Sequence, residues 1–153
     1  MPHTHASPRR RLAAFSLVEV LVFVTVVGLS FTTAALISSF SLKVAKTNEA
    51  KILATRYAEE LAEWLRGEKE ADWEIFKGKV GDWCFNASPI SNANGWQSSG
   101  SCGSYVLGQK YKRDLTISQT SDPNQLDISV VVSWQEGSNS LSVPVHTVFS
   151  RFE

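Results

Sequence analysis

The stretch that decides the architecture of this chain is Phe15–Leu42, F-S-L-V-E-V-L-V-F-V-T-V-V-G-L-S-F-T-T-A-A-L-I-S-S-F-S-L. It is apolar almost throughout, and the basic run Arg9–Arg11 lies just before it. Between Glu19 and Lys43 there are 23 uncharged residues, and about 20 are enough to cross a bilayer as a helix. The stretch therefore predicts one membrane-spanning helix. The arginines before it predict that the N-terminal end stays in the cytoplasm and that the rest is exported.

One residue of this stretch is unlike its neighbours, because Glu19 places a carboxylate four positions inside the apolar run. A carboxylate in hydrocarbon is costly, so an acid inside a membrane span is a functional candidate by default. Three interpretations of the first 42 residues compete. A plain signal anchor and a cleaved secretory signal, cut near Thr33-Ala34-Ala35, give no reason for the acid. The secretory signal is also disfavoured because its apolar region would exceed the usual length of about 7–15 residues.

The third interpretation rests on a family resemblance. The short basic leader, the small residue Ala14 and the motif Phe-Ser-Leu-Val-Glu at 15–19, running into a long apolar helix, resemble the type IV pilin and pseudopilin family. In that family a prepilin peptidase on the cytoplasmic side cuts just before the Phe and methylates the new amino terminus. The resemblance implies a cut between Ala14 and Phe15, N-methylation of Phe15, and a role for Glu19 in docking the subunit into a filament. The family more often has Gly where this chain has Ala14.

The resemblance also implies a function and a location. The chain would be a structural subunit of a type IV pilus-like filament, most like a minor pilin, with a prepilin peptidase, other pilin subunits and the membrane as partners. It would first be a single-pass protein of the cytoplasmic (inner) membrane with an exported C-terminal domain, and then part of an extracellular pilus or pseudopilus. Two alternatives remain open: a pseudopilin of a type II secretion system, and a signal-anchored exported binding domain.

Charge and cysteine content add to this picture. Lysines plus arginines equal aspartates plus glutamates in number, 15 of each. Removal of a leader that carries three arginines leaves a formal charge of −3 on the rest. Such a mildly acidic chain is not expected to bind nucleic acid, because nucleic-acid binders carry a basic stripe or a high isoelectric point. The two cysteines, Cys84 and Cys102, both lie in the exported part and predict one disulfide.

The sequence contains no recognisable catalytic constellation. His146 is the only histidine outside the first 14 residues, and it occupies an outward position of a predicted strand. There is neither a nucleophile-elbow pattern nor a glycine-rich phosphate loop. Two cysteines and one distant histidine are too few ligands for a structural zinc ion. We therefore expect no catalytic residue, no metal and no cofactor. A membrane-anchored enzyme is the third alternative, and it would depend on His146.

Beyond Lys43 the apolar residues take three- and four-residue steps, which predict that the helix continues as an amphipathic half. One helix over 15–66 is expected, with Gly67 as its C-cap. Its apolar stripe is expected to cover a sheet, its alanines add helix propensity, and its acids form a solvated face. The stripe consists of Ile52, Leu53, Tyr57, Leu61, Trp64 and Leu65, and the acids are Glu59, Glu60, Glu63, Glu68 and Glu70.

The remainder predicts a loop and a small sheet, so the fold class is α+β: a long N-terminal helix on a small antiparallel, pilin-like sheet. The expected domains are a leader over 1–14, a membrane and assembly helix over 15–42, and an ectodomain over 43–153. The basic run Lys110–Arg113 is expected to be exposed. Pro144 predicts that the last strand is an edge or carries a bulge. The expected elements are a short helix at 71–77, a loop at 82–103, and strands at 104–107, 112–120, 125–134 and 141–151.

Overall fold

The computed structural model describes residues 16–90 and 95–152, in two compact units. The first unit ends at Ala45 and the second begins at Lys46. Helix α1 (Leu17–Ala71) is a single element of 55 residues that belongs to both units. In the first unit, α1 is the only regular element among the described residues, and its side chains are almost all exposed.

The prediction of one long helix is confirmed, but the expected C-cap at Gly67 is wrong, because α1 continues to Ala71. Gly67 has open space where a Cβ would lie, so it occupies an ordinary helical position. The helix ends where Asp72 adopts an extended conformation (φ −158°) and caps the next helix. The Asp72 carboxylate accepts a hydrogen bond from the backbone N–H of Ile75 at 3.0 Å. An N-capping aspartate is among the strongest local signals for a helix start.

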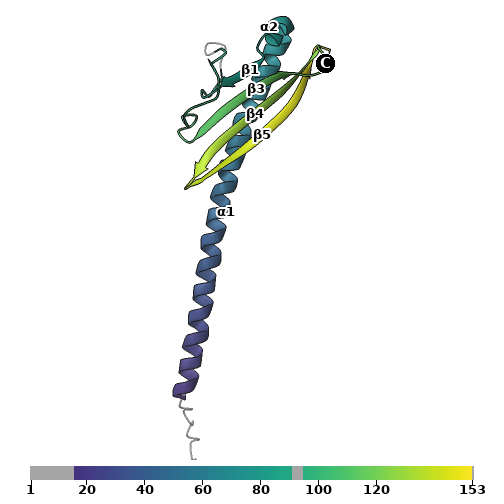
Figure 1. Cartoon of the computed structure of the whole chain (residues 1–153). Coiled ribbons are helices and arrows are strands. Elements are labelled where there is room, and N and C mark those ends of the chain that lie inside the picture. The colour runs from purple at the N-terminus through teal and green to yellow at the C-terminus, as the bar shows by residue number, and fades with distance from the viewer. Residues whose placement is uncertain (1–15, 91–94, 153) are drawn as a thin grey trace, which may run out of the picture. The chain divides into compact units, whose positions relative to one another are not determined.

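The second unit combines the C-terminal part of α1, the short helix α2 (Trp73–Lys77) and one five-stranded antiparallel sheet (Figure 1). The spatial order of the strands is β2-β1-β3-β4-β5. The α+β class and the three-stranded meander are confirmed, but two details are wrong. Residues 82–103 are not all loop, since they contribute to β1 and β2, and residues 104–107 form no strand beyond a bridge from Leu107 to Tyr111. The strands are β1 (Gly81–Cys84), β2 (Ser98–Ser99), β3 (Tyr111–Gln119), β4 (Gln125–Glu136) and β5 (Asn139–Ser150).

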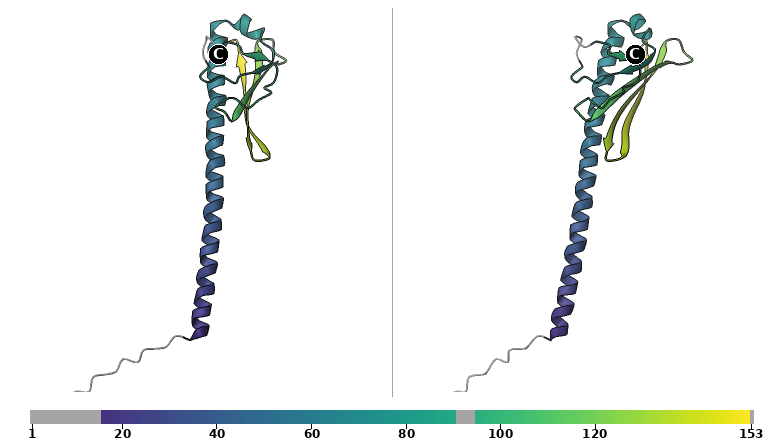
Figure 2. Two further views of the ribbon diagram at one scale, coloured as in Figure 1. Left: turned by 90° about the vertical axis from the view of Figure 1, so that its left-hand side faces the viewer. Right: turned by 60° about the vertical axis from the view of Figure 1, so that its left-hand side comes forward.

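One face of the sheet carries the core of the second unit. Inward side chains alternate with outward ones along β3 and β4, as the period of two in a strand requires. In Figure 2 the sheet lies along the part of α1 that belongs to this unit. The core contains residues from α1, α2 and the sheet that expose 4% of their surface or less. They include Leu61, Leu65, Phe76, Phe85, Leu115, Ile117, Leu126, Ile128, Val130, Val132, Trp134 and Phe149.

The contact between α1 and the sheet is made largely by alanine. Ala54 and Ala58 are fully buried and Ala50 exposes 4% of its surface, whereas Leu53 of the predicted stripe exposes 38% and Ile52 exposes 58%. Of the predicted stripe, Leu61 and Leu65 are fully buried and Tyr57 and Trp64 pack against the core. Only its N-terminal part is wrong, because the buried face continues through the three alanines and not through Ile52 and Leu53. The spacing of 50, 54 and 58 repeats every four residues and lines up one narrow face. Leu61 and Leu65 continue this buried face toward the C-terminal end of α1.

Pro144 occupies an edge strand, as predicted, because β5 pairs only with β4 among the described strands. The β4–β5 hairpin turns at Gly137 and Ser138 and closes on the pair Glu136–Asn139. A two-residue turn closes on a hydrogen-bonded pair, and bonded and non-bonded pairs then alternate. Counting from Asn139, the even-numbered residues of β5 are the non-bonded positions. Pro144 is one of them, so its nitrogen faces the free edge. Proline thus costs the sheet no hydrogen bond and removes one donor from the exposed edge.

Ala58→Leu tests the alanine contact. We expect a loss of about 1–3 kcal/mol in the free energy of unfolding, because extra methylenes in a packed core force shifts of its neighbours. Urea unfolding of the full chain in detergent, followed by tryptophan fluorescence, measures this loss. All five tryptophans lie in the second unit. Ala71→Leu, at the exposed end of α1, is the matched control, and equal effects of the two substitutions would contradict the contact.

Pro144→Val tests the edge. The substitution restores an N–H on the free side of β5, and edge strands with unpaired donors recruit other chains. We expect the fold to be retained and the rate of thermal aggregation to rise by roughly threefold or more. Ser142→Val is the control, because it adds at least as much apolar surface as Pro144→Val at an exposed outward position of β5, without a new donor. Aggregation raised equally by both variants would show that hydrophobicity, and not the missing N–H, is what matters.

Candidate functional site

The first candidate site is the apolar segment, which we define as residues 17–42 of α1. It is long and apolar enough to cross a membrane, and none of its most apolar window is buried within the protein. Leu21, Phe31 and Leu42 expose 58%, 73% and 66% of their surface, whereas core leucines of the second unit expose about none. Burying such side chains stabilises each by roughly 1.5–3 kcal/mol. The apolar segment therefore needs lipid or other protein around it.

Six of the seven hydroxyl groups of the apolar segment are satisfied within the helix. Six serine and threonine side chains each donate to a backbone carbonyl three or four residues earlier, at 2.8–3.1 Å. A hydroxyl that donates in this way carries no unsatisfied donor into hydrocarbon, where an unpaired polar group is costly. These residues are Thr25, Ser30, Thr32, Thr33, Ser38 and Ser39.

Glu19 contrasts with these hydroxyls. It lies exposed in the first turn of α1, and within the described part of the chain no hydrogen bond or ion pair to its carboxylate is found. A negative charge near a helix N-terminus is favourable, because the helix dipole is positive there. That effect is small compared with the cost of an acid in hydrocarbon. The predicted cleavage and methylation positions, Ala14 and Phe15, lie outside the described residues.

Small residues form a second feature of the apolar segment. Five of them recur at steps of three and four, so these five line one face of the helix, whereas Ser30, Thr33, Ala34, Ser38 and Ser41 lie on other faces. At 100° per residue, this face lies about 160° around the helix from Glu19. At Gly28 there is open space where a Cβ would lie. The small-residue face, as we call it, consists of Thr25, Gly28, Thr32, Ala35 and Ser39.

In the second unit, the predicted disulfide between Cys84 and Cys102 is present, with an S–S distance of 2.05 Å and a Cα–Cα distance of 4.8 Å. Cys84 is the last residue of β1, and it lies opposite Asp114 of β3. The backbone N–H of Cys102 donates to the carboxylate of the same Asp114. Both cysteines are thus fixed to one position of β3. Closing a loop of this size stabilises a fold by about 3 kcal/mol in the chain-entropy model.

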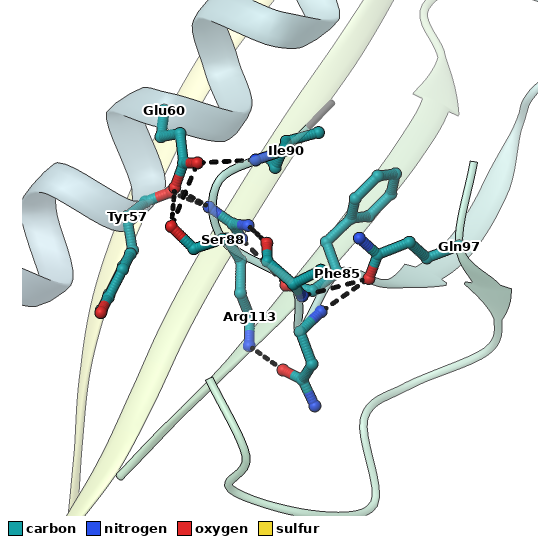
Figure 3. Close-up of polar contacts among 9 residues, drawn as sticks. Tyr57, Glu60, Phe85, Ser88, Ile90, Gln97 and Arg113 are labelled. Atoms are coloured by element: carbon teal, nitrogen blue, oxygen red, sulfur yellow. Dashed lines mark hydrogen bonds and ion pairs between the residues drawn. The ribbon is translucent and has the colours of Figure 1, made fainter. Parts of the chain in front are cut away.

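Next to the disulfide, Arg113 of β3 is fully buried (Figure 3). Its guanidinium donates to the backbone carbonyls of Phe85, Tyr57 and Ala87 at 2.9, 2.6 and 2.7 Å. It also forms an ion pair with Glu60 of α1 at 3.0 Å. Burial lowers the pKa of the Arg113 guanidinium from its usual value, and the hydrogen bond and charge of Glu60 oppose that shift. Arginine stays protonated at all ordinary pH values, so the buried charge is permanent.

Glu60 is the other half of this arrangement. Besides Arg113, its carboxylate accepts a hydrogen bond from the hydroxyl of Ser88 at 3.0 Å and from the backbone N–H of Ile90 at 2.9 Å. We call Arg113 and Glu60, with the carbonyls of residues 57, 85 and 87, the Arg113 clamp. It joins α1, β3 and the segment 85–90 that follows Cys84.

The Arg113 clamp corrects two predictions. Arg113 is buried, not part of an exposed basic run, and Glu60 is not part of a solvated face. A signal for the first was present, because Arg113 alternates with the apolar Tyr111, Leu115 and Ile117 on the inward face of β3. The signal for Glu60 was weaker. It lies on the flank of α1 beside Tyr57 and Trp64, and its partner is 53 residues away in sequence.

The tryptophans of the second unit are mainly part of the core. Trp96, from the loop closed by the disulfide, lies 5.0–6.0 Å, measured between ring centroids, from Trp64, Phe76, Trp83 and Phe85. Its indole N–H donates to Glu68 at 3.1 Å. This half-buried ring fastens the loop to α1, and it leaves little of the indole for a ligand.

His146 is exposed on the outer face of the sheet, where it lies opposite Ser129. No hydrogen bond joins the two side chains among the interactions of the described residues, and those residues contain no group of three or more His, Cys, Asp or Glu placed to hold a metal ion. Comparisons of the chain with protein-family models, with curated proteins and with solved structures gave no match. Its function is therefore inferred from its own residues.

Proposed function

We propose that this chain is a structural subunit of a type IV pilus-like filament, most like a minor pilin, and is not itself an enzyme. A prepilin peptidase would remove residues 1–14 in the cytoplasmic membrane, and the chain starting at Phe15 would then assemble. The observation that carries the proposal is Glu19, a carboxylate on an exposed apolar helix whose hydroxyls are all but one paired within the helix. A helix that only anchors a domain has no use for such an acid.

The physical argument concerns charge in hydrocarbon. Cleavage before Phe15 would create a positively charged amino group four residues from Glu19. Each charge alone is costly in the bilayer, and pairing them within one subunit or between neighbours relieves both costs. The other side chains of the apolar segment are uncharged, so this pair would also fix the axial register between adjacent helices.

The small-residue face supports assembly of more than two helices. Helices approach closely in membranes where small residues meet, and Gly28 offers open space at its surface. Because Glu19 is about 160° away around the helix, the two features would address different neighbours. Such head-to-tail contacts produce an open filament, whereas a two-fold dimer uses one shared surface. A type II secretion pseudopilin would use the same features, and the proposed subunit role covers both assemblies.

The state of the N-terminus tests processing directly. Intact mass and N-terminal sequencing of the chain from membrane and filament fractions of the native host are expected to give a chain beginning at N-methylated Phe15. The same chain made in a host without the peptidase should keep residues 1–14. A native chain that still begins at Met1, or one that begins after Ala35, would overturn the proposal in favour of a simple anchor or ordinary secretion.

Glu19→Gln tests assembly. The substitution removes the charge but keeps the shape, so we expect incorporation into sheared filaments to fall by at least about tenfold, since a lost ion pair in hydrocarbon costs several kcal/mol. The ratio of filament-bound to membrane-bound chain, measured by quantitative immunoblotting, gives the effect. Val20→Ala, one residue further along the helix, is the control and should assemble normally. Normal assembly of the Glu19→Gln chain would leave the acid unexplained and would count against the filament role.

A further inference from the structure

This inference concerns the Arg113 clamp and does not depend on the proposed filament assembly. The clamp and the disulfide share their attachment points. The Sγ atom of Cys102 lies 3.2 Å from the carbonyl oxygen of Arg113, and the same carbonyl accepts a hydrogen bond from the N–H of Phe85 at 2.9 Å. Cys84 immediately precedes Phe85. The sulfur bridge is therefore in direct contact with the residue whose guanidinium holds the segment 85–90.

The segment 85–90 is held in place by contacts with other parts of the chain, and the ring of Phe85 packs against Trp64 and Trp96. Phe85 is buried, but Ser88 and Pro89 are exposed and Ile90 is only half-buried. Four backbone N–H groups in this segment have acceptors outside it. Phe85 donates to the Arg113 carbonyl, Asn86 and Ala87 donate to the Gln97 side chain at 2.9 and 3.3 Å, and Ile90 donates to Glu60. The three acceptors, of which the Gln97 oxygen serves two N–H groups, are brought to the segment by β3, by α1 and by the part of the loop that leads to Cys102.

The segment 85–90 also stabilises the buried Arg113 side chain. Two of its four side-chain hydrogen bonds go to carbonyls of the segment. If the segment moved away, a fully buried guanidinium would lose these acceptors, and a buried charge without partners is strongly unfavourable. The ordered conformation of the segment 85–90 and the burial of Arg113 therefore depend on each other.

We propose that the Arg113 clamp is a redox-dependent latch: the segment 85–90 is held against α1 and β3 when Cys84 and Cys102 are oxidised, and is released when they are reduced. In the closing step the two thiols lose two protons and two electrons and form one S–S bond. An external disulfide accepts the electrons and leaves as two thiols. The surface made by Ser88, Pro89 and Ile90 therefore adopts a single conformation after a disulfide oxidant has formed the Cys84–Cys102 bond, and not before.

Hydrogen exchange of the full-length chain in detergent micelles tests the latch. Oxidised chain is compared with chain reduced by a phosphine and with the double variant Cys84→Ser/Cys102→Ser. We expect the four bonded amides of segment 85–90 to exchange at least about tenfold faster without the disulfide, while amides of β4 and β5 change by less than about twofold. Unchanged exchange in segment 85–90 overturns the proposal. An equal loss of protection in β4 and β5 also overturns it, since the disulfide would then be a staple for the whole unit.

A second measurement uses the clamp itself and a matched control. Glu60→Gln removes the charge that faces Arg113, whereas Glu63→Gln removes the same charge from an exposed ion pair with Arg66 on the same helix. Coupling between two sites is reciprocal. Weakening the clamp should therefore shift the disulfide–dithiol equilibrium in a glutathione buffer toward the dithiol, by the same factor by which reduction weakens the clamp. Glu60→Gln is expected to shift it by about threefold or more, and Glu63→Gln not at all. Equal behaviour of the two variants would show that the clamp and the disulfide are independent.

Discussion

Helix α1 depends on one constraint: its two ends must be stable in surroundings that make opposite demands on a helix surface. In the apolar segment most side chains are apolar and exposed, and six of the seven hydroxyls donate to the helix backbone. In the second unit the same helix needs one narrow face that fits a sheet and another that tolerates water. The alanines at 50, 54 and 58 provide the first of these, and charged residues provide the second. No capping residue separates the two halves, so the change of surroundings falls within a continuous helix.

The packing of α1 on the sheet has a consequence for polar groups. Glu60 lies on the flank of this buried face, within 3.0 Å of the guanidinium of Arg113 on β3. Arg113 can then be buried with one carboxylate and three backbone carbonyls as partners. Replacing a buried ion pair by apolar residues is often neutral for stability, so the pair is better explained by the segment that it positions. The geometry of the alanine contact and the position of the segment 85–90 are therefore linked.

The parts of this architecture that were predicted from sequence are those governed by local periodicity. The length and apolarity of the first stretch predicted the helix, and the period-two runs predicted β3, β4 and β5 nearly to their bounds. The disulfide was predicted from the number of cysteines and from the expected export of the part that contains them. Leu61 and Leu65 of the predicted stripe are buried, but its N-terminal part was misplaced, because Ile52 and Leu53 were weighted above the alanines at 50, 54 and 58. Gly67 was taken as a cap because the stronger signal, Asp72, lies five residues later.

Arg113 and Glu60 show why long-range polar pairs escape such prediction. Each residue taken alone has an ordinary explanation, an exposed basic run for one and a solvated helix face for the other. Their pairing depends on the strand order, on the register of β3 and on the rotation of α1, none of which a single sequence states. Glu19 is the opposite case, because its position in an apolar run long enough to cross a membrane is visible from the sequence alone. Acids in a membrane span can therefore be identified early, whereas a buried ion pair between distant elements becomes visible only once the fold is known.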